Sequence, residues 1–286
     1  MKINKPNIST TIRLALLLIL TLSINCTKKE YITIVQPEEP EPRVLWVPDD
    51  FETIQDAINA SQDGDTVRVK AGTYQEGLRL FGKNIWLESE TGPEEAFIDG
   101  TGWNNGITIK DGENYLNTTI RGFTIYSSNV GIQIYSPSGT TIYNCIFRNL
   151  ANVEDYDGVW YAGGYGFIYN CIFDSCYTGI TGGYSVGDFS NSIFIRCYGR
   201  AYNHYASFNN WITYGWNLFW NNEENYSPED EQHFGDVFAD LLFIEGSYVL
   251  SDNSHAIDAG DPSIQDKDGS RSDIGVHGGP YAYPIP

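Results

Sequence analysis

Basic residues are scarce in this chain, and their scarcity narrows the partners that it can have. The sequence has 17 Lys and Arg residues against 37 Asp and Glu residues, for a formal net charge of −20. Such a surface repels nucleic acid and anionic lipid, so we expect neither as a partner. A polyanionic glycan would also be repelled unless a divalent cation bridged the two charges.

Cysteines and long apolar runs are also few. None of the five Cys residues shows the CxxC or Cys/His spacing that is typical of a zinc site. The apolar run at residues 14–24 has 11 residues, which is short of the roughly 20 that a membrane-spanning helix needs. It follows a basic start containing Lys2, Lys5 and Arg13, and this order predicts a signal peptide over residues 1–25.

The end of this peptide, LSINC, resembles the signal of bacterial lipoproteins, in which the Cys becomes the lipidated first residue. Leu22 and Cys26 match that signal, and Asn25 stands where Gly, Ala or Ser is usual. The resemblance implies export to the bacterial cell envelope or surface with Cys26 as the lipid anchor, and plain secretion is the alternative. Residues 26–43 are rich in Pro and Glu and predict an extended tether.

The hexapeptide IYNCIF occurs twice, within TIYNCIF (141–147) and FIYNCIF (167–173). Looser versions extend the repeat, and successive anchor positions lie 22, 26, 21 and 25 residues apart; they are Ile120, Ile142, Ile168, Phe189 and Tyr214. A period of this length indicates stacked units of short strands. The sequence therefore predicts an all-β fold, a right-handed parallel β-helix, with like residues above like.

Stacking gives the polar and sulfur residues of the repeat their expected places. Asn144, Asn170 and Asn191 share one repeat position, where we expect a corner with side-chain amides bonded to one another as a ladder. Cys145 and Cys171 share a second position, and Cys176 and Cys197 a third. Both stacked free thiols and a disulfide are compatible with these positions.

The open end of such a coil needs a cap, and VPDDFETIQDAINASQDGDTV predicts a helix for the N-terminal end. Asp49 and Glu52 suit a capping box, and Phe51, Ile54 and Ile58 fall on one helical face. Counting from Val44 to about Gly260 predicts roughly nine coils.

The stretch VPDDFETIQDAINASQDGDTVRVKAGTYQEG resembles the opening of right-handed parallel β-helix proteins of the pectate-lyase-like superfamily. FADLLFIEGSYVLSDNSHAIDAGDPSIQDKDGSRSDIGVHGGP resembles the cap-like closing region of bacterial surface β-helix proteins of the choice-of-anchor-Q type. Together these resemblances cover about residues 44–281. They imply a single β-helix domain over residues 44–286, with the closing region beginning at about 236.

Pectinesterases of this superfamily would have a Gln-Asp pair after the YNC-F strand and a second Asp one coil later. Tyr177 and Thr178 stand in the places of the pair, and Gly199 stands near the place of the second Asp. We therefore do not expect esterase activity of that kind. Fold resemblance alone does not decide between the remaining activities.

Other catalytic chemistry has only weak candidates. A lyase needs a basic residue, and residues 111–260 contain no Lys, so Arg200 with His204 is the one plausible cluster there. Glycoside hydrolysis needs two carboxyl groups, for which Asp157, Asp174 and Asp188 are candidates. Asp266, Asp268 and Asp273 surround a Gly and offer oxygen ligands for a calcium site, with a plain turn as the alternative.

Aromatic residues are concentrated between Tyr156 and Tyr226, where they make up 21 of 71 positions. We name this stretch the aromatic belt. A narrow coil cannot bury all of them, and exposed Trp and Tyr rings suit the faces of sugars. The candidates for glycan contact are Trp160, Tyr161, Trp211, Trp216 and Trp220.

Two functions stay open on the sequence. The first is binding of a neutral or weakly charged polysaccharide along an aromatic-rich groove, by a protein that meets the membrane only through its lipid anchor. The second is a polysaccharide lyase or glycoside hydrolase that acts in the same groove. No cofactor is implied by either, apart from calcium.

Overall fold

The computed structural model describes residues 41–110, 118–135, 139–150, 157–161, 164–182, 185–204, 212–226 and 234–285. The chain divides into two units, Met1–Pro40 and Glu41–Pro286, and the second contains every described strand and the one described helix. The expected signal peptide, Cys26 and most of the tether lie outside the described residues. The described part contains no helix with the length and apolarity to cross a membrane.

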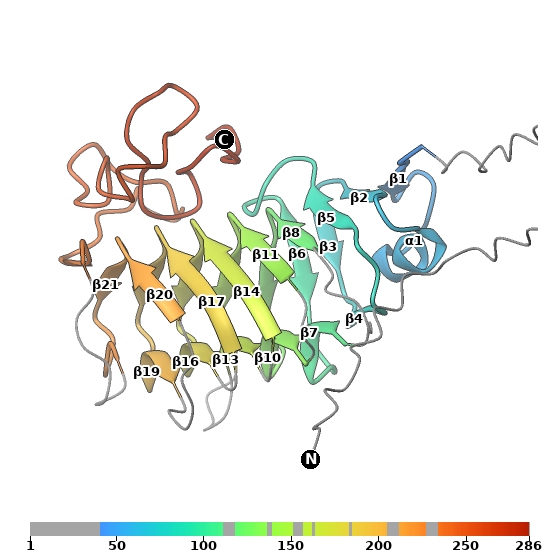
Figure 1. Ribbon diagram of the computed structural model, residues 1–286, viewed down its shortest axis with the longest axis horizontal. Coiled ribbons are helices and arrows are strands. Elements are labelled where there is room, and N and C mark those ends of the chain that lie inside the picture. The colour runs from blue at the N-terminus through green and yellow to red at the C-terminus, as the bar shows by residue number, and fades with distance from the viewer. Residues whose placement is uncertain are drawn as a thin grey trace, which may run out of the picture. The chain divides into compact units, whose positions relative to one another are not determined.

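The second unit is a parallel β-helix, as predicted, with three sheets of stacked short strands (Figure 1). Sheet A has eight strands: β1 (Val44–Val47), β2 (Thr66–Val69), β5 (Trp86–Ser89), β8 (Thr119–Arg121), β11 (Gly139–Tyr143), β14 (Gly164–Tyr169), β17 (Ser185–Ser190) and β20 (Ile212–Gly215).

Sheet B also has eight strands: β3 (Gly72–Tyr74), β6 (Ala96–Asp99), β9 (Thr124–Tyr126), β12 (Ile146–Arg148), β15 (Ile172–Asp174), β18 (Ile193–Ile195), β21 (Leu218–Trp220) and β22 (Val237–Phe238). Sheet C has six: β4 (Leu78–Leu80), β7 (Asn105–Ile109), β10 (Val130–Ile134), β13 (Asp157–Tyr161), β16 (Thr178–Gly182) and β19 (Arg200–His204). All strands within a sheet pair in parallel, so each pairs with the strand one turn of the coil away.

The strand register confirms the repeat read from the sequence. Ile142 pairs with Ile120 on one side and Ile168 on the other, and Phe189 continues the column to Tyr214. The apolar residues of IYNCIF lie in two separate buried clusters. Ile142, Cys145 and Phe147 are buried in the interior, whereas Ile146 belongs to a separate buried cluster outside the coil.

The phenylalanines of the repeat form the expected inward stack. Phe173 lies 4.9 Å from Phe147 and 4.8 Å from Phe194 by ring centroids, and each pair is tilted by only 7°. Gly158 lies across the coil from this stack, and a Cβ on it would come within 2.5 Å of the Phe173 ring. The large ring in sheet B therefore requires the absence of a side chain in sheet C.

The cysteine columns are buried free thiols. The Cys145 thiol donates to the Tyr143 carbonyl, and the Cys171 thiol donates to the Tyr169 carbonyl. Burial raises the pKa of the Cys145 thiol to about 12, so it stays protonated and unreactive at neutral pH. Of the two alternatives left by the sequence, the structure has the free thiols.

The predicted cap helix exists as α1 (Ile54–Ala60), but its predicted cap is wrong. Thr53 is the N-cap and accepts a hydrogen bond from the Asp56 N–H, whereas Asp49 pairs with Lys70. Both ends of α1 are satisfied by the coil. The Glu76 carboxylate accepts from the first helical N–H groups, and the Lys83 ammonium donates to three carbonyls at the other end.

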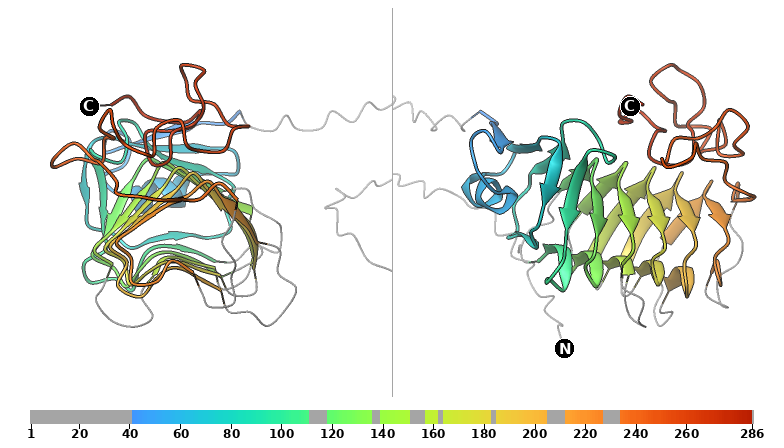
Figure 2. Two further views of the ribbon diagram at one scale, coloured as in Figure 1. Left: turned by 90° about the vertical axis from the view of Figure 1, so that its left-hand side faces the viewer. Right: turned by 180° about the vertical axis from the view of Figure 1, so that it is seen from behind.

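Residues 239–285, which we call the strap, correct two expectations. They form no coils. The two longer sheets of the β-helix therefore have eight strands each, fewer than the roughly nine expected from nine coils. The strap residues also lie along the side of the strands instead of continuing them, as the end-on view of Figure 2 shows. The reason is an apolar column on the outside of sheet B, namely Ile146, Ile172, Ile193 and Leu218, which strap residues such as Ile274 and Val276 bury.

The Asn column holds the strap in place. Asn144, Asn170 and Asn191 occupy the left-handed corner conformation and are buried, as a shared corner position requires. Their amides do not bond to one another in the expected ladder. Asn144 donates to the Val276 and Gly278 carbonyls, and Asn170 donates to the Asp273 and Gly275 carbonyls, so the strap supplies the acceptors at this corner.

Candidate functional site

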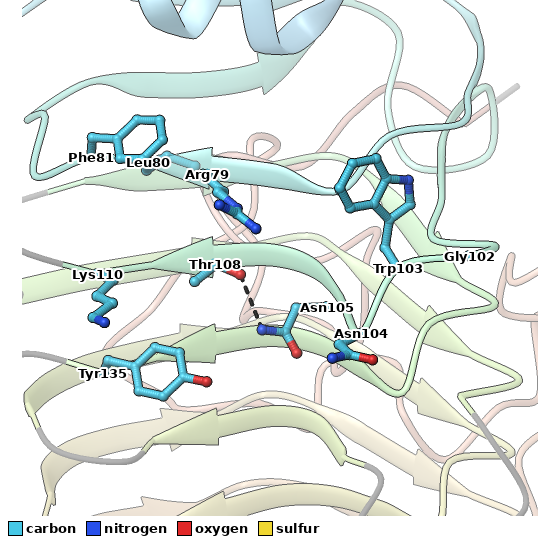
Figure 3. A pocket seen from close by; sticks show the side chains of 11 residues that line it. Arg79, Leu80, Phe81, Gly102, Trp103, Asn104, Asn105, Thr108, Lys110 and Tyr135 are labelled. Carbon is cyan, nitrogen blue, oxygen red and sulfur yellow. Dashed lines mark hydrogen bonds between the residues drawn. The ribbon is translucent and has the colours of Figure 1, made fainter.

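A groove with a volume of about 670 Å³ lies over β4, β7 and β10 of sheet C. Its lining comes from three successive coils and from the loop that precedes β7 (Figure 3). The lining residues are Gly77, Arg79, Leu80, Phe81, Gly102, Trp103, Asn104, Asn105, Thr108, Lys110 and Tyr135. It is larger than a cavity of about 410 Å³ that lies beside sheet B.

One wall of the groove is a column of side chains at the ends of the strands. Leu80, Ile109 and Ile134 are in register, so the residues after them are also stacked. Those residues are Phe81, Lys110 and Tyr135, which places a cation between two aromatic rings. The rings are 59% and 44% exposed, respectively, and the Lys110 ammonium lies 5.8 Å from the Tyr135 ring.

The opposite wall is formed by Trp103, which faces this column across the groove in Figure 3. Its indole is 47% exposed and packs directly over Gly77, where an added Cβ would lie 2.5 Å from the ring. The backbone N–H of Trp103 also donates to the Gly100 carbonyl, and this bond fixes the loop. The ring is therefore held in place by its backbone contacts and has one face free for a ligand.

The floor of the groove is polar. Arg79, Thr108 and Gln133 form one column in register. The Asn105 side chain joins two of them, because its amide nitrogen donates to Thr108 Oγ1 at 3.0 Å and to Gln133 Oε1 at 2.8 Å. These bonds orient the Asn105 amide, so its oxygen and the remaining polar hydrogens of the floor point in fixed directions.

The groove also concentrates positive charge in an acidic chain. Arg79 and Lys110 are exposed, and neither takes part in any ion pair that the described residues form. The backbone of Arg79 is fixed by Gln55 of α1, whose side-chain amide bonds both the Arg79 N–H and its carbonyl. The cap helix thus closes the edge of β4 and positions the end of the groove.

The three acids predicted for hydrolysis lie on three different sheets. Asp157 begins β13 in sheet C, Asp174 ends β15 in sheet B, and Asp188 lies in β17 of sheet A. Asp174 is committed to an ion pair with Arg196, and Asp188 accepts a hydrogen bond from the Tyr169 hydroxyl. Burial raises the pKa of Asp188. The three strands thus belong to different sheets, and the carboxylates of Asp174 and Asp188 are engaged by other side chains of the protein.

The predicted cluster of Arg200 and His204 lies on one strand, β19, of which they are the first and last residues. Arg200 pairs with Glu224 at 2.6 Å and donates to the Asn203 side chain. Its charge is therefore engaged within the protein. The side chain of His204 lies outside the described part of the chain.

The predicted aromatic belt is distributed over several surfaces. Trp216 lies at the corner between β20 and β21 and packs edge-on against Phe234, and Trp220 is 43% exposed at the end of β21 in sheet B. Trp160 and Tyr161 end β13 in sheet C, and their side chains, like the whole of Trp211, lie outside the described residues. The described belt positions thus do not share one sheet.

The predicted calcium ligands accept hydrogen bonds within the strap's own turns. Asp266 accepts from the Asp273 N–H, Asp268 accepts from Ser270, and Asp273 accepts from the Asp258 N–H. The described residues contain no group of three or more His, Cys, Asp or Glu side chains placed to hold a metal ion. Calcium binding here stays a prediction from the sequence without support from this geometry.

Sequence reasoning overlooked the groove because it searched residues 111–260 for cations and residues 156–226 for aromatics. Lys110 lies one position before the first of these ranges, and Trp103 lies 53 positions before the second. Two signals could have found them. Phe81 and Tyr135 each follow an alternating apolar strand directly, and Trp103 stands in a Gly- and Asn-rich loop, where no core is available to bury it.

Comparisons with known proteins found no matching family model and no matching curated protein. One similar solved structure is a mutant pectin methylesterase in complex with a hexasaccharide. It shares 17% sequence identity, with a TM-score of 0.36, over 64% of this chain and 72% of the other. This likeness is too distant to carry an argument about activity, and the fold stands on the strand register described above.

Proposed function

We propose that the protein is an exported, lipid-anchored β-helix protein that binds a polysaccharide in the groove of sheet C. The groove carries this proposal, because it combines three exposed aromatic rings with an oriented polar floor. Aromatic rings suit the CH-rich faces of sugars, and fixed amide and hydroxyl groups suit their hydroxyls. The groove crosses the strands of sheet C, so a chain can follow the coil axis.

The charges of the groove narrow the ligand. Arg79 and Lys110 favour a glycan with some anionic substituents over a neutral one. The net charge of −20 acts in the opposite direction on a densely charged polymer. Of the neutral and weakly charged polysaccharides predicted from the sequence, a weakly charged one fits both conditions, and none of the described lining residues calls for a cofactor.

The decisive experiment compares two exposed tryptophans. Trp103→Ala removes the ring from the groove, and Trp220→Ala removes a ring of similar exposure from sheet B. We expect the first variant to lose about tenfold in affinity, or ~1.4 kcal/mol, for any glycan that binds the wild type on an array. The second should bind as the wild type does. Equal affinities in both variants, or a loss only in Trp220→Ala, would place the binding elsewhere.

A polysaccharide lyase is the second candidate, and Lys110 favours it, because a basic residue without an ion pair among the described residues could abstract a proton beside a uronate. The described lining has no carboxylate, so a two-carboxylate hydrolase lacks its residues there. Ultraviolet absorbance of the unsaturated product would reveal elimination. The lyase is excluded if wild type and Lys110→Ala both leave uronate-containing glycans uncleaved.

Lipidation is tested separately from binding. We expect the chain, expressed in a bacterium from its own signal, to incorporate labelled fatty acid at Cys26. The Cys26→Ser variant should lose the label and leave the membrane fraction. An unlabelled wild type in the culture medium would instead favour plain secretion.

A further inference from the structure

A second cavity, of about 410 Å³, lies between the C-terminal ends of strands in sheet B and the start of the strap. Arg148 and Arg196 line it from the coil, and Leu241 and residues 243–248 line it from the strap. The cavity lies on sheet B, whereas the groove lies on sheet C, so its function does not depend on the proposed polysaccharide site.

The guanidinium of Arg148 is held rigidly at this cavity. Its central carbon lies 5.8 Å from the centroid of the Phe97 ring and 5.6 Å from that of Tyr126. Both rings come from neighbouring strands of sheet B, since Tyr126 is in register with Arg148 and ends β9. Such contacts orient the plane of the guanidinium, which also interacts with the Tyr248 hydroxyl of the strap.

Arg148 is the cation of this cavity that has no ion-pair partner among the described residues. None of their ion pairs includes Arg148, and its Nε is buried without a hydrogen-bond acceptor. Its neighbour in register is Asp174, but that carboxylate accepts from Arg196 Nε at 2.8 Å and from the Tyr248 hydroxyl at 2.7 Å. Two cations therefore share one anion, and Arg148 is the cation left over.

We propose that this cavity binds a small oxyanion, either a carboxylate, a sulfate or a phosphate, against the edge of Arg148. The planar fork of a guanidinium matches the spacing of two such oxygens. Leu241, Phe243 and Ile244 form apolar walls beside the two guanidinium groups. The cavity also has room for the molecule that carries the oxyanion.

Glu245 is the group that opposes this binding. It lines the same cavity, is exposed, and forms no ion pair among the described residues. An anion bound beside Arg148 would be repelled by the Glu245 carboxylate, so removal of that charge should raise the affinity for the anion. This gives the site a variant that strengthens it as well as one that weakens it.

Isothermal titration of the protein with sodium sulfate, phosphate and acetate at low ionic strength tests the proposal. We expect at least one of the three to bind the wild type with a millimolar Kd, and the preferred anion identifies the oxyanion class. Arg148→Gln should weaken that binding at least tenfold, and Glu245→Gln should strengthen it severalfold. Lys70→Gln removes a charge from an exposed pair with Asp49 and should change nothing.

The proposal is overturned if none of the three anions binds the wild type with a Kd below about 10 mM. It is also overturned if Arg148→Gln and Lys70→Gln weaken the binding to the same extent, because the net charge of the protein would then explain the binding. Arg148 also interacts with the Tyr248 hydroxyl of the strap, so its replacement can destabilise the fold. If Arg148→Gln unfolds, Glu245→Gln decides the question by itself, since unchanged affinity in that variant refutes the site.

Discussion

The groove of sheet C and the aromatic belt are both rich in aromatic side chains, yet the coil uses the two sets differently. In the belt, Phe173 and its stacked neighbours fill the interior, and Trp216 packs against Phe234. In the groove, Trp103 rests on a glycine with one face free. Aromatic content thus does not identify a binding surface. What distinguishes Trp103 is that a glycine supports its ring from one side while 47% of the residue remains exposed.

The largest effect that would test this comparison is on the interior stack. Phe173→Ala should lower the free energy of unfolding by about 3–5 kcal/mol, because it removes a fully buried ring from between two others. Urea denaturation measures the loss, and glycan affinity of the folded fraction should not change. Phe167→Ala, at a site in the belt that is 38% exposed, is the matched control and should cost much less.

The corner that joins the belt to the strap should show the next largest effect. Asn170→Ala removes the donor to the strap carbonyls and places Ala in the left-handed conformation, at a cost of about 2–3 kcal/mol. Asn170→Gly keeps the backbone freedom and loses only the bonds, so it should cost less than Ala. An equal loss in both variants would mean that the backbone conformation contributes nothing.

The support beneath Trp103 gives a smaller effect, and one on binding rather than on folding. Gly77→Ala places a methyl group where the indole now lies, so the ring must shift from its position in the groove. We expect glycan affinity to fall severalfold, with the free energy of unfolding changed by about 1 kcal/mol or less. Gly102→Ala is the control nearby, because a Cβ there meets no atom, although its left-handed backbone carries some strain. Unchanged binding in Gly77→Ala would show that the ring position does not matter.

The smallest expected effect is a pH dependence at the strap. Burial lowers the pKa of His277 below its usual value, and the nearby Glu94 offsets this only in part. Since the unfolded chain binds a proton more readily than the folded one, stability should fall as the pH drops below about 6.5 towards the folded pKa. His277→Gln should flatten this part of the stability profile between pH 7.5 and 5.5. A profile identical to that of the wild type would exclude His277 as its source.

Much of the fold was predictable because repetition fixes it. The equal positions of Ile120, Ile142 and Ile168 in the repeats became pairs in register, and the Asn residues became corners. The capping helix was also found, although its N-cap is Thr53. The sequence pattern failed for the strap, since residues 239–285 have no repeat and find their place only by contact with sheet B.

The candidate site was less predictable, because its residues are brought together by the coil and share no motif. Phe81, Lys110 and Tyr135 are separated by 29 and 25 positions in the sequence and are stacked only once the strands are in register. The candidate acids show the converse. Asp157, Asp174 and Asp188 are close in sequence, but the coil distributes them over three sheets. Closeness along a solenoid sequence does not give closeness on a face.

The sequence by itself determined that the chain coils, where it turns and which residues fill the interior, because burial recurs with every turn and leaves a periodic pattern. Only the tertiary structure decided which side of the coil is covered and which is open. The outside of sheet B is covered by the strap, and the groove of sheet C is left accessible. Side chains on an outer face follow no period of their own, so their use depends on what packs against them.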